Sequence, residues 1–331
     1  MNTPIIELES VSKRFVKKLD ASEKLARRLG AKVEEHTVHA VDNVDMAIQQ
    51  GEVVGLVGES GCGKSTLGRC VAGVHAPSDG TIRYRGNDVA SLRGAEALES
   101  RLKVQMIFQD PMSSLNPRLK VAEIISEAPL YHRLIDRRQV DDFVAETMKR
   151  VGLDPSYHQR YPHQFSGGQR QRIGIARALA VQPEFIVCDE AVAALDVSIQ
   201  AQVLNLFMDL REDLGLTYLF ISHDLGVVEH LSDRVVIMYL GRVVETAPTD
   251  PLFAEPNHPY TQALLAEAPR LETDRRVYAP IKGEIPSPLD PPKGCHFHPR
   301  CPHAMDRCRT EPPKLKEIAA GRFSACHLND G

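Results

Sequence analysis

A glycine-rich segment near residue 60 is the part of this sequence best suited to chemistry. GESGCGKS, residues 58–65, has the spacing G-x-x-x-x-G-K-[ST], in which successive backbone N–H groups of a tight loop surround phosphate oxygens. Lys64 is expected to reach the β- and γ-phosphates and Ser65 to ligate Mg²⁺. The alternative is a glycine-rich turn with an incidental lysine. An apolar run before the segment and an expected helix after it favour an ATP site formed by Gly58, Glu59, Ser60, Gly61, Cys62, Gly63, Lys64, Ser65 and Thr66.

A second acidic segment supplies the other half of such a site. FIVCDE, residues 185–190, is an apolar run that ends in two carboxylates. Asp189 at the carboxyl end of a buried strand can hold the water shell of Mg²⁺, and Glu190 can act as the general base toward water. Alone, such a pair is more often a strand-exit turn. Together with the phosphate loop it predicts hydrolysis of a nucleotide.

The elements that must position these residues alternate between strand and helix. Apolar or alternating runs predict strands within 4–8 and 41–57, and the helix after the phosphate loop should begin at Lys64 or Ser65. Continuous apolar runs predict buried parallel strands at 185–189 and 217–223.

Three further segments complete the expected organisation. A strand pair turns around Gly241, the region of about 95–180 spaces its apolar residues helically, and the charged stretch 17–36 predicts a solvated helix or a flexible insertion without chemistry. Prolines become frequent after about 248. We therefore expect an α/β protein with the P-loop NTPase fold: an ATP-binding domain at 1–250 with an inserted helical subdomain at about 95–180, and a Pro- and Cys-rich extension at 251–331.

Composition excludes several classes of protein. The 331 residues are 43% hydrophobic and 25% charged, which is ordinary for a globular protein and argues against a disordered chain. A net charge of -4 gives no reason to expect nucleic-acid binding. No apolar run approaches the roughly 18–20 residues of a membrane span, and MNTPIIELESVSKRF lacks a secretory signal. We expect a cytoplasmic protein.

Four more segments occur in an order that resembles a known family. They are Gln109 in IFQDP, FSGGQRQR at 165–172, ALD at 194–196 and SHD around His223. With the two nucleotide motifs they resemble the ATP-binding subunits of ABC transporters over nearly the whole chain. By this resemblance Gln109 would contact Mg²⁺ and the attacking water, His223 would hydrogen-bond the γ-phosphate, and Asp196 would communicate across a dimer.

The resemblance implies a head-to-tail dimer in which a serine-glycine turn closes over ATP held by the partner's Lys64 loop. The dimer would contain a paralogous ATPase subunit, which we favour, or a second copy of this chain. SGG also suits the cap of the helix QRQRIGIARALA, where a hydroxyl, backbone N–H groups and the helix dipole face a phosphate. The same residues also suit a purely structural helix cap, and that role does not exclude binding of ATP. The turn comprises Ser166, Gly167, Gly168 and Gln169.

The sequence departs from the family after the catalytic glutamate. Ala191 and Ala193 stand where a proline and a serine are usual, and this departure is expected to affect the rigidity of the loop and the rate of hydrolysis more than the reaction. The aromatic residue that stacks on adenine is not fixed by the spacing. Phe15 and His36 are the candidates.

The C-terminal part has a resemblance of its own. NHPYTQALL from Asn257 and the later GEIPSPLDPPKGC resemble the terminal extension of dipeptide and oligopeptide importer ATPases. The similarity includes four cysteines, and in a reducing compartment such a group indicates metal rather than disulfides. That subfamily favours a 4Fe-4S cluster, whereas spacing alone leaves Zn²⁺ and a metal-free extension open. The thiols are Cys295, Cys301, Cys308 and Cys326, with His296, His298, His303 and His327 as possible substitutes.

The combined expectation is an ATPase subunit of an importer. It would couple ATP hydrolysis to uptake of dipeptides, oligopeptides or a related solute, at the cytoplasmic face of the plasma membrane, with two transmembrane permease subunits and an extracytoplasmic solute-binding protein. DPMSSLNP, residues 110–117, is the expected docking surface for the permeases. The rivals are a soluble ABC ATPase of DNA repair or translation and a redox sensor centred on the cysteines. Unchanged ATPase turnover in a Glu190→Gln variant would contradict the motor mechanism.

Overall fold

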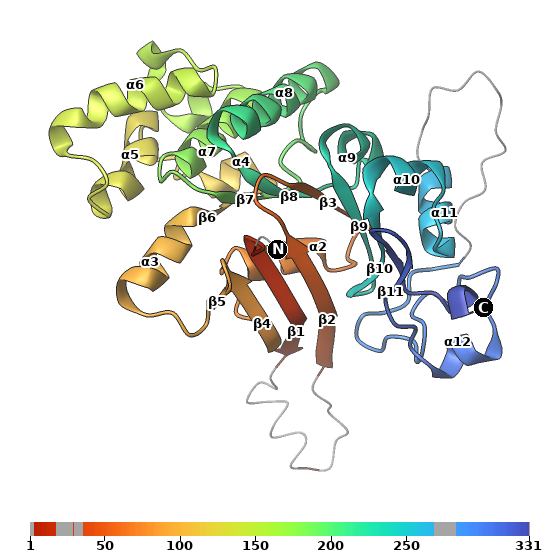
Figure 1. Cartoon of the computed structure of the whole chain (residues 1–331). Coiled ribbons are helices and arrows are strands. Elements are labelled where there is room, and N and C mark those ends of the chain that lie inside the picture. The colour runs from red at the N-terminus through yellow and green to blue at the C-terminus, as the bar shows by residue number, and fades with distance from the viewer. Residues whose placement is uncertain (1–2, 18–28, 30–35, 268–282, 331) are drawn as a thin grey trace.

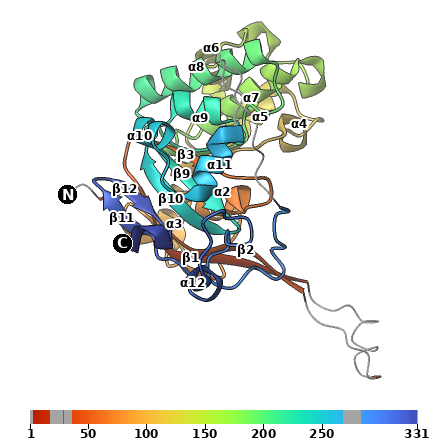
Figure 2. The same ribbon diagram turned by 90° about the vertical axis from the view of Figure 1, so that its right-hand side faces the viewer.

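The fold is that of a computed structural model, which describes residues 3–17, 29, 36–267 and 283–330. The charged stretch expected at 17–36 lies almost entirely outside the described residues. Figures 1 and 2 show a main sheet with a helical layer on one face and a smaller antiparallel sheet on the other.

The main sheet has a parallel centre. It has eight strands in the order β11-β12-β10-β9-β3-β8-β7-β6, and the five strands from β9 to β6 run parallel. Their bounds are β6 Val104–Ile107, β7 Phe185–Asp189, β8 Thr217–Ile221, β3 Val53–Val57 and β9 Arg234–Tyr239.

Both faces of this centre are covered, which explains why its strands are continuous apolar runs. Every residue of β3, β7 and β8 is buried, as expected of parallel strands between two layers. Alternate side chains enter two cores: Ile186 and Phe220 pack toward the helical layer, and Val187 and Leu219 toward the antiparallel sheet. The buried strands expected at 185–189 and 217–223 are confirmed, the second ending at Ile221.

The antiparallel sheet has the order β2-β1-β4-β5. The helix α2 (Lys64–Val71), which begins at Lys64 as expected, packs between it and the main sheet. The run expected as strand within 41–57 divides into β2 and β3 at the turn of residues 49–52. The strands are β1 Ile6–Lys17, β2 His36–Ile48, β4 Asp79–Tyr84 and β5 Asn87–Asp88.

The helical region also contains one strand of the main sheet. β6 interrupts the region expected to be helical at about 95–180 and pairs with β7, so helix periodicity alone missed it. The helices are α3 Gly94–Lys103, α4 Pro111–Ser114, α5 Val121–Tyr131, α6 Val140–Arg150 and α7 Gly167–Leu179, followed by α8 Val197–Leu214 and α9 Leu225–Leu231.

The C-terminal part packs onto the main sheet rather than extending from it. β10 forms the expected hairpin with β9 around Gly241, and β12 then pairs with β10 through Glu245 and Ser324. The expected extended appendage was wrong in this respect, because backbone pairing over so long a sequence separation leaves no local signal. The elements are β10 Arg242–Pro248, α10 Thr249–Ala254, α11 Pro259–Glu267, α12 Asp306–Thr310, β11 Lys316–Ala319 and β12 Arg322–Ser324.

Within the described ranges, no helix is both long and apolar enough to span a membrane.

Candidate functional site

The phosphate loop joins β3 to α2 in a conformation that depends on glycine. Gly63 has φ 105°, and a Cβ there would lie 2.0 Å from the carbonyl oxygen of Ala40. A Cβ on Gly58 would lie 2.1 Å from the Met238 carbonyl oxygen. No described side chain caps the N-terminus of α2, so its backbone N–H groups face the loop. The sequence spacing thus corresponds to a cradle of the kind that binds phosphate.

Lys64 is buried and turned onto its own loop. Its ammonium donates to the carbonyl oxygens of Gly58 at 2.7 Å and Glu59 at 3.0 Å. Only 5% of the residue is exposed. A buried ammonium close to an anion-binding loop is suited to bind the charge of a triphosphate.

Asp189 and Ser65 form the candidate magnesium site. The hydroxyl of Ser65 donates to Asp189 Oδ1 at 2.6 Å, whereas Oδ2 is buried without a hydrogen-bond partner among the described residues. Arg69 lies 3.8 Å from that oxygen. Burial raises the pKa of Asp189 by more than the hydrogen bond from Ser65 and the charge of Arg69 lower it, so the charged carboxylate is only partly compensated. A hydroxyl and an unpaired buried carboxylate oxygen fit Mg²⁺, which takes oxygen ligands.

Glu190 follows the same strand and is held in a rare backbone conformation. Its φ is 48°, in the left-handed region that non-glycine residues seldom adopt, and its N–H donates to Ile221 O at 3.0 Å. Gln109 Nε2 donates to Glu190 Oε2 at 2.6 Å, and His223 Nδ1 lies 3.5 Å from the same oxygen. Three side chains from the ends of three parallel strands therefore meet at one carboxylate, as expected for ligand sites in α/β sheets.

The loop after Glu190 is tied by turns. Ala191 is buried, the N–H of Ala193 donates to Glu190 O at 3.1 Å, and that of Leu195 donates to Val192 O at 3.2 Å. The effect of the two alanines on the rate of hydrolysis stays a prediction.

A pocket of about 400 Å³ lies over these groups. Phe15 lines it, whereas His36 is not among its lining residues, so Phe15 is the better candidate for adenine stacking. Sequence reasoning missed Val38, Ala40 and Pro288, the last of which comes from the C-terminal part. The whole lining is Phe15, Val38, Ala40, Ser60, Gly61, Gly63, Lys64, Ser65, Thr66, Gln109, Glu190 and Pro288.

The serine-glycine turn lies apart from this pocket. Ser166 Oγ accepts from Gln169 N–H at 3.3 Å, and Gln169 Oε1 accepts from Ser166 N–H at 3.0 Å, which is the capping box expected at the start of α7. A Cβ on Gly168 would lie 2.3 Å from a side-chain methyl of Ile199, so a larger residue there would displace the Ile199 side chain. Among the described residues that line the pocket, none belongs to this turn, and Asp196 at the start of α8 is also absent.

Comparison with known proteins gives this arrangement a family. Residues 41–193 match the family described as ABC transporter, and residues 244–308 match the oligopeptide/dipeptide transporter C-terminal region. The oligopeptide transport ATP-binding protein AppF of Bacillus subtilis is 49% identical over 98% of this chain and 97% of its own length. The chain belongs to the ABC transporter family. As an ABC ATPase it binds and hydrolyses ATP.

Two further relatives of this ABC ATPase support the assignment. A probable peptide ABC transporter ATP-binding protein of Sinorhizobium fredii is 52% identical over 88% of this chain and 83% of its own length. The ATP-binding cassette MJ0796, solved as a dimer in a post-hydrolysis state with ADP and Pi, is 27% identical with a TM-score of 0.62, over 74% of this chain and 98% of that one. The expected P-loop NTPase fold is confirmed.

The four C-terminal cysteines of the ABC ATPase share one region. All are free thiols, and Cys295 N–H donates to Cys308 O at 2.9 Å. Burial, followed by the charges of Cys308, Cys326 and Cys301, raises the pKa of Cys295 to about 11. Across the described parts of the chain, no three His, Cys, Asp or Glu side chains are arranged to bind a metal ion.

The nearby histidines already have partners. His296 Nδ1 contacts Leu240 O at 3.1 Å, His298 Nδ1 contacts Cys295 O at 2.9 Å, and His327 contacts Asp330 and Glu311. For these histidines a structural role is therefore favoured over substitution for a thiolate.

Proposed function

We propose that this ABC ATPase is the motor subunit of an importer that couples ATP hydrolysis to uptake of dipeptides, oligopeptides or a related solute. The observation that carries the proposal is the match of residues 244–308 to the C-terminal region of oligopeptide and dipeptide transporters. Relatives of about half-identical sequence are named as peptide or oligopeptide transport ATP-binding proteins. The residues of the nucleotide pocket supply the chemistry that such a motor needs.

The parallel strands of the main sheet all end at one edge, which we call the carboxyl edge, and begin at the opposite one, the amino edge. Each group at the carboxyl edge has a distinct part in hydrolysis. Lys64 and the loop N–H groups would bind the β- and γ-phosphates. Ser65 and Asp189 would hold Mg²⁺, which would supply positive charge to these phosphates. Glu190 is the proposed general base, which accepts a proton from the attacking water. Gln109 Nε2 and His223 Nδ1 lie 2.6 and 3.5 Å from Glu190 Oε2, where they are suited to orient the water and the γ-phosphate.

A second ATPase subunit completes the site. Ser166, Gly167, Gly168 and Gln169 belong to the start of α7 and do not line the pocket of their own chain, although their N–H groups and helix dipole suit a phosphate. They would close over ATP in a paralogous subunit or a second copy, with Asp196 near the same contact. The dimeric MJ0796 cassette offers a related precedent.

The membrane partners are two permease subunits, which would place this chain at the cytoplasmic face of the plasma membrane as a peripheral subunit. An extracytoplasmic solute-binding protein would deliver the solute. The docking surface is the segment 110–117, which directly follows Gln109 and includes α4 with the half-exposed Met112. Photo-crosslinking from Met112 should capture a permease, and capture of none in intact membranes would contradict this assignment.

Transport itself tests the proposed function. The complex that copurifies from membranes is reconstituted in vesicles, and uptake of labelled dipeptides and longer peptides is followed with and without Mg-ATP. ATP-dependent uptake that a Glu190→Gln variant abolishes is expected. ATP hydrolysis by the complex without uptake of any peptide would exclude peptide import while leaving the ATPase assignment intact.

We further propose that the four cysteines bind a 4Fe-4S cluster, with Zn²⁺ as the alternative. The support is their number, their electrostatic influence on one another and the family resemblance of the segment. As these thiols lie in the described part of the chain, they do not form a ready ligand set. Anaerobic purification with iron and zinc analysis and visible spectra decides the matter. Stoichiometric zinc in colourless protein would exclude the 4Fe-4S cluster. Protein that contains neither iron nor zinc would exclude both metal assignments.

A further inference from the structure

Glu59 of the phosphate loop is bound by an arginine that lies 241 positions further along the chain. Arg300 Nη1 donates to Glu59 Oε2 at 2.7 Å, and Nη2 donates to Oε1 at 2.9 Å. The arginine side chain is only 4% exposed and that of the glutamate 18%. A bidentate, mostly buried pair of this kind fixes the orientation of both side chains.

The backbone of Glu59 is held from the same direction. Its N–H donates to the hydroxyl of Tyr260 in α11 at 2.9 Å, and Tyr260 is fully buried. The rings of Tyr239, Tyr260 and Phe297 pack together with centroids 4.6 to 5.4 Å apart. The Arg300 guanidinium lies 5.8 Å from the centroid of Tyr239. Side chain and main chain of one loop residue are thus both fixed by the C-terminal part.

Glu59 connects these contacts to the phosphate-binding lysine. Its carbonyl oxygen accepts from Lys64 Nζ at 3.0 Å, so a displacement of Glu59 moves an acceptor that positions the ammonium. The C-terminal part also reaches the other side of the pocket: Pro288 lines the pocket, and its carbonyl oxygen accepts from His39 N–H at 3.0 Å. In both views the C-terminal segments lie beside β2 and β10 (Figures 1 and 2).

We propose that Arg300 and Tyr260 are positioning residues for ATP binding, acting as a clamp that holds the phosphate loop in its binding conformation. The clamp touches Glu59 and not the phosphates. The C-terminal part is therefore a support of the nucleotide site in addition to any role in binding metal or partners. A pair that served stability alone would have no effect on nucleotide affinity beyond its effect on folding.

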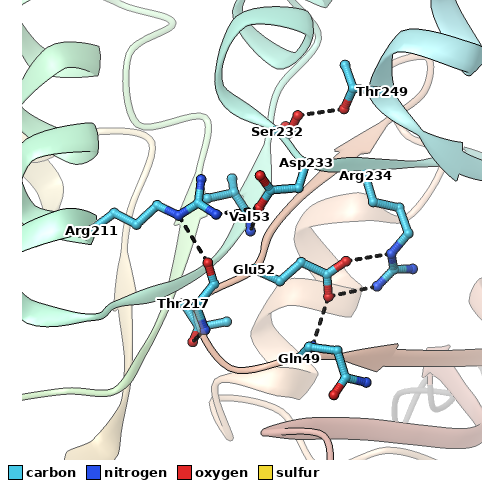
Figure 3. A network of polar contacts seen from close by, with 10 residues as sticks. Gln49, Glu52, Val53, Arg211, Thr217, Ser232, Asp233, Arg234 and Thr249 are labelled. Atoms are coloured by element: carbon cyan, nitrogen blue, oxygen red, sulfur yellow. Dashed lines mark hydrogen bonds and ion pairs between the residues drawn. The ribbon is translucent and has the colours of Figure 1, made fainter.

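A second arginine–glutamate pair serves as a control that distinguishes a positioning role from a role in stability alone. Arg234 binds Glu52 with two contacts of 2.7 and 3.2 Å, and its side chain is 22% exposed. Figure 3 shows this second pair, in which Glu52 lies just before β3 and Arg234 begins β9, so that the pair lies at the amino ends of the parallel strands. Arg300→Met and Arg234→Met each remove one guanidinium from one glutamate, and only the first should alter the phosphate loop.

The experiment uses the full chain in a Glu190→Gln background and measures the Kd for Mg-ATP by calorimetry, with Tm measured alongside. Arg300→Met is expected to raise the Kd about tenfold, which corresponds to about 1.4 kcal/mol. Arg234→Met should lower Tm and leave the Kd within about twofold, a range of about 0.4 kcal/mol. An unchanged Kd in Arg300→Met, or an equal rise in both variants, would overturn the proposal.

Two milder variants keep the test decisive if Arg300→Met does not fold. Tyr260→Phe removes only the hydroxyl that accepts from Glu59 and should raise the Kd about threefold, or about 0.65 kcal/mol. Arg300→Lys, which keeps the charge but loses the bidentate geometry, should fall between wild type and Arg300→Met. In the assembled complex with Glu190 intact, Tyr260→Phe should raise the KM for ATP more than it lowers kcat. No change in Kd or KM for Tyr260→Phe would refute the clamp.

Discussion

Two arginine–glutamate pairs lie at opposite edges of one parallel sheet and differ in what surrounds them. At the amino edge, Arg234 and Glu52 belong to a network in which Asp233 accepts from Val53 N–H at 2.8 Å and from Arg211 at 2.6 Å (Figure 3). The charged groups of this network pair with one another.

At the carboxyl edge, the Arg300–Glu59 pair supports the phosphate loop. The acidic residues beside this loop are not fully paired or relaxed. Asp189 Oδ2 is buried without a hydrogen-bond partner among the described residues, and Glu190 keeps a left-handed backbone. The contrast indicates that the amino edge contributes stability, whereas the carboxyl edge keeps charged groups available to a ligand at some cost in stability.

The largest expected difference between the edges is in turnover. Glu190→Gln should lower kcat for ATP by about 100-fold or more, because it removes the proposed general base while preserving shape. Glu52→Gln, the control at the amino edge, should leave kcat within twofold while lowering the free energy of unfolding by about 1–2 kcal/mol. Phosphate release and urea unfolding measure both. Comparable losses of kcat in the two variants would remove the contrast.

The next largest difference concerns Mg²⁺. Asp189→Asn should weaken activation by Mg²⁺ about 10- to 100-fold, since it removes the carboxylate proposed to hold the metal. Without Mg²⁺ and nucleotide it should also stabilise the chain, because burial raises the pKa of Asp189 and its charged form is unfavourable at pH 7.

Asp233→Asn is the matched control for Asp189→Asn. It should destabilise the chain by about 0.5–1 kcal/mol and leave the dependence on Mg²⁺ unchanged, because Asp233 is paired with Arg211. Magnesium titrations of ATPase activity and thermal unfolding provide the two measurements. A destabilised Asp189→Asn chain in the absence of Mg²⁺ would contradict our account of the carboxyl edge.

A smaller effect is expected where the base would lie. Phe15 lines the pocket and is 39% exposed, although Lys13 Nζ lies over its ring at 5.1 Å from the centroid, so stacking on adenine would use the exposed part of the ring. Phe15→Leu should raise the KM for ATP about fivefold, near the lower limit of aromatic–base stacking energies. His36→Leu should leave KM unchanged, because His36 is not among the pocket-lining residues. The reverse order of effects in steady-state kinetics would make His36 the stacking residue.

The smallest effect is a dependence of stability on pH at the carboxyl edge. Burial lowers the pKa of His258 from 6.5 to about 4, and its Nδ1 accepts from the N–H of the clamp residue Tyr260. The unfolded chain takes up a proton below about 6.5 and the folded chain only near 4, so stability is lost as pH falls between these values.

His258→Asn keeps an acceptor and removes the titration. From pH 7 to pH 5 it should lose about 1–2 kcal/mol less stability than wild type. Urea unfolding at the two pH values measures the difference. Equal losses in wild type and variant would show that His258 does not titrate in this range.

Local motifs predicted the local structure around the candidate nucleotide site, because that structure depends on residues close in sequence. Strand, glycine loop and helix follow one another around Lys64, and the capping box at Ser166 lies within the four residues 166–169. The pairing of β12 with β10 and the contact of Arg300 with Glu59 join segments far apart in sequence. Such contacts follow from burial in the assembled core, and no periodicity or spacing marks them beforehand.

The central claim is that Mg-ATP and the serine-glycine turn of a second ATPase subunit complete the carboxyl edge. A photo-crosslinking amino acid at the exposed His163, just before that turn, tests it directly in the Glu190→Gln complex from membranes. With Mg-ATP, mass spectrometry should find His163 joined to the phosphate-loop peptide of another ATPase subunit, and without ATP this product should be scarce. A product that is confined to one chain or independent of ATP would contradict the claim.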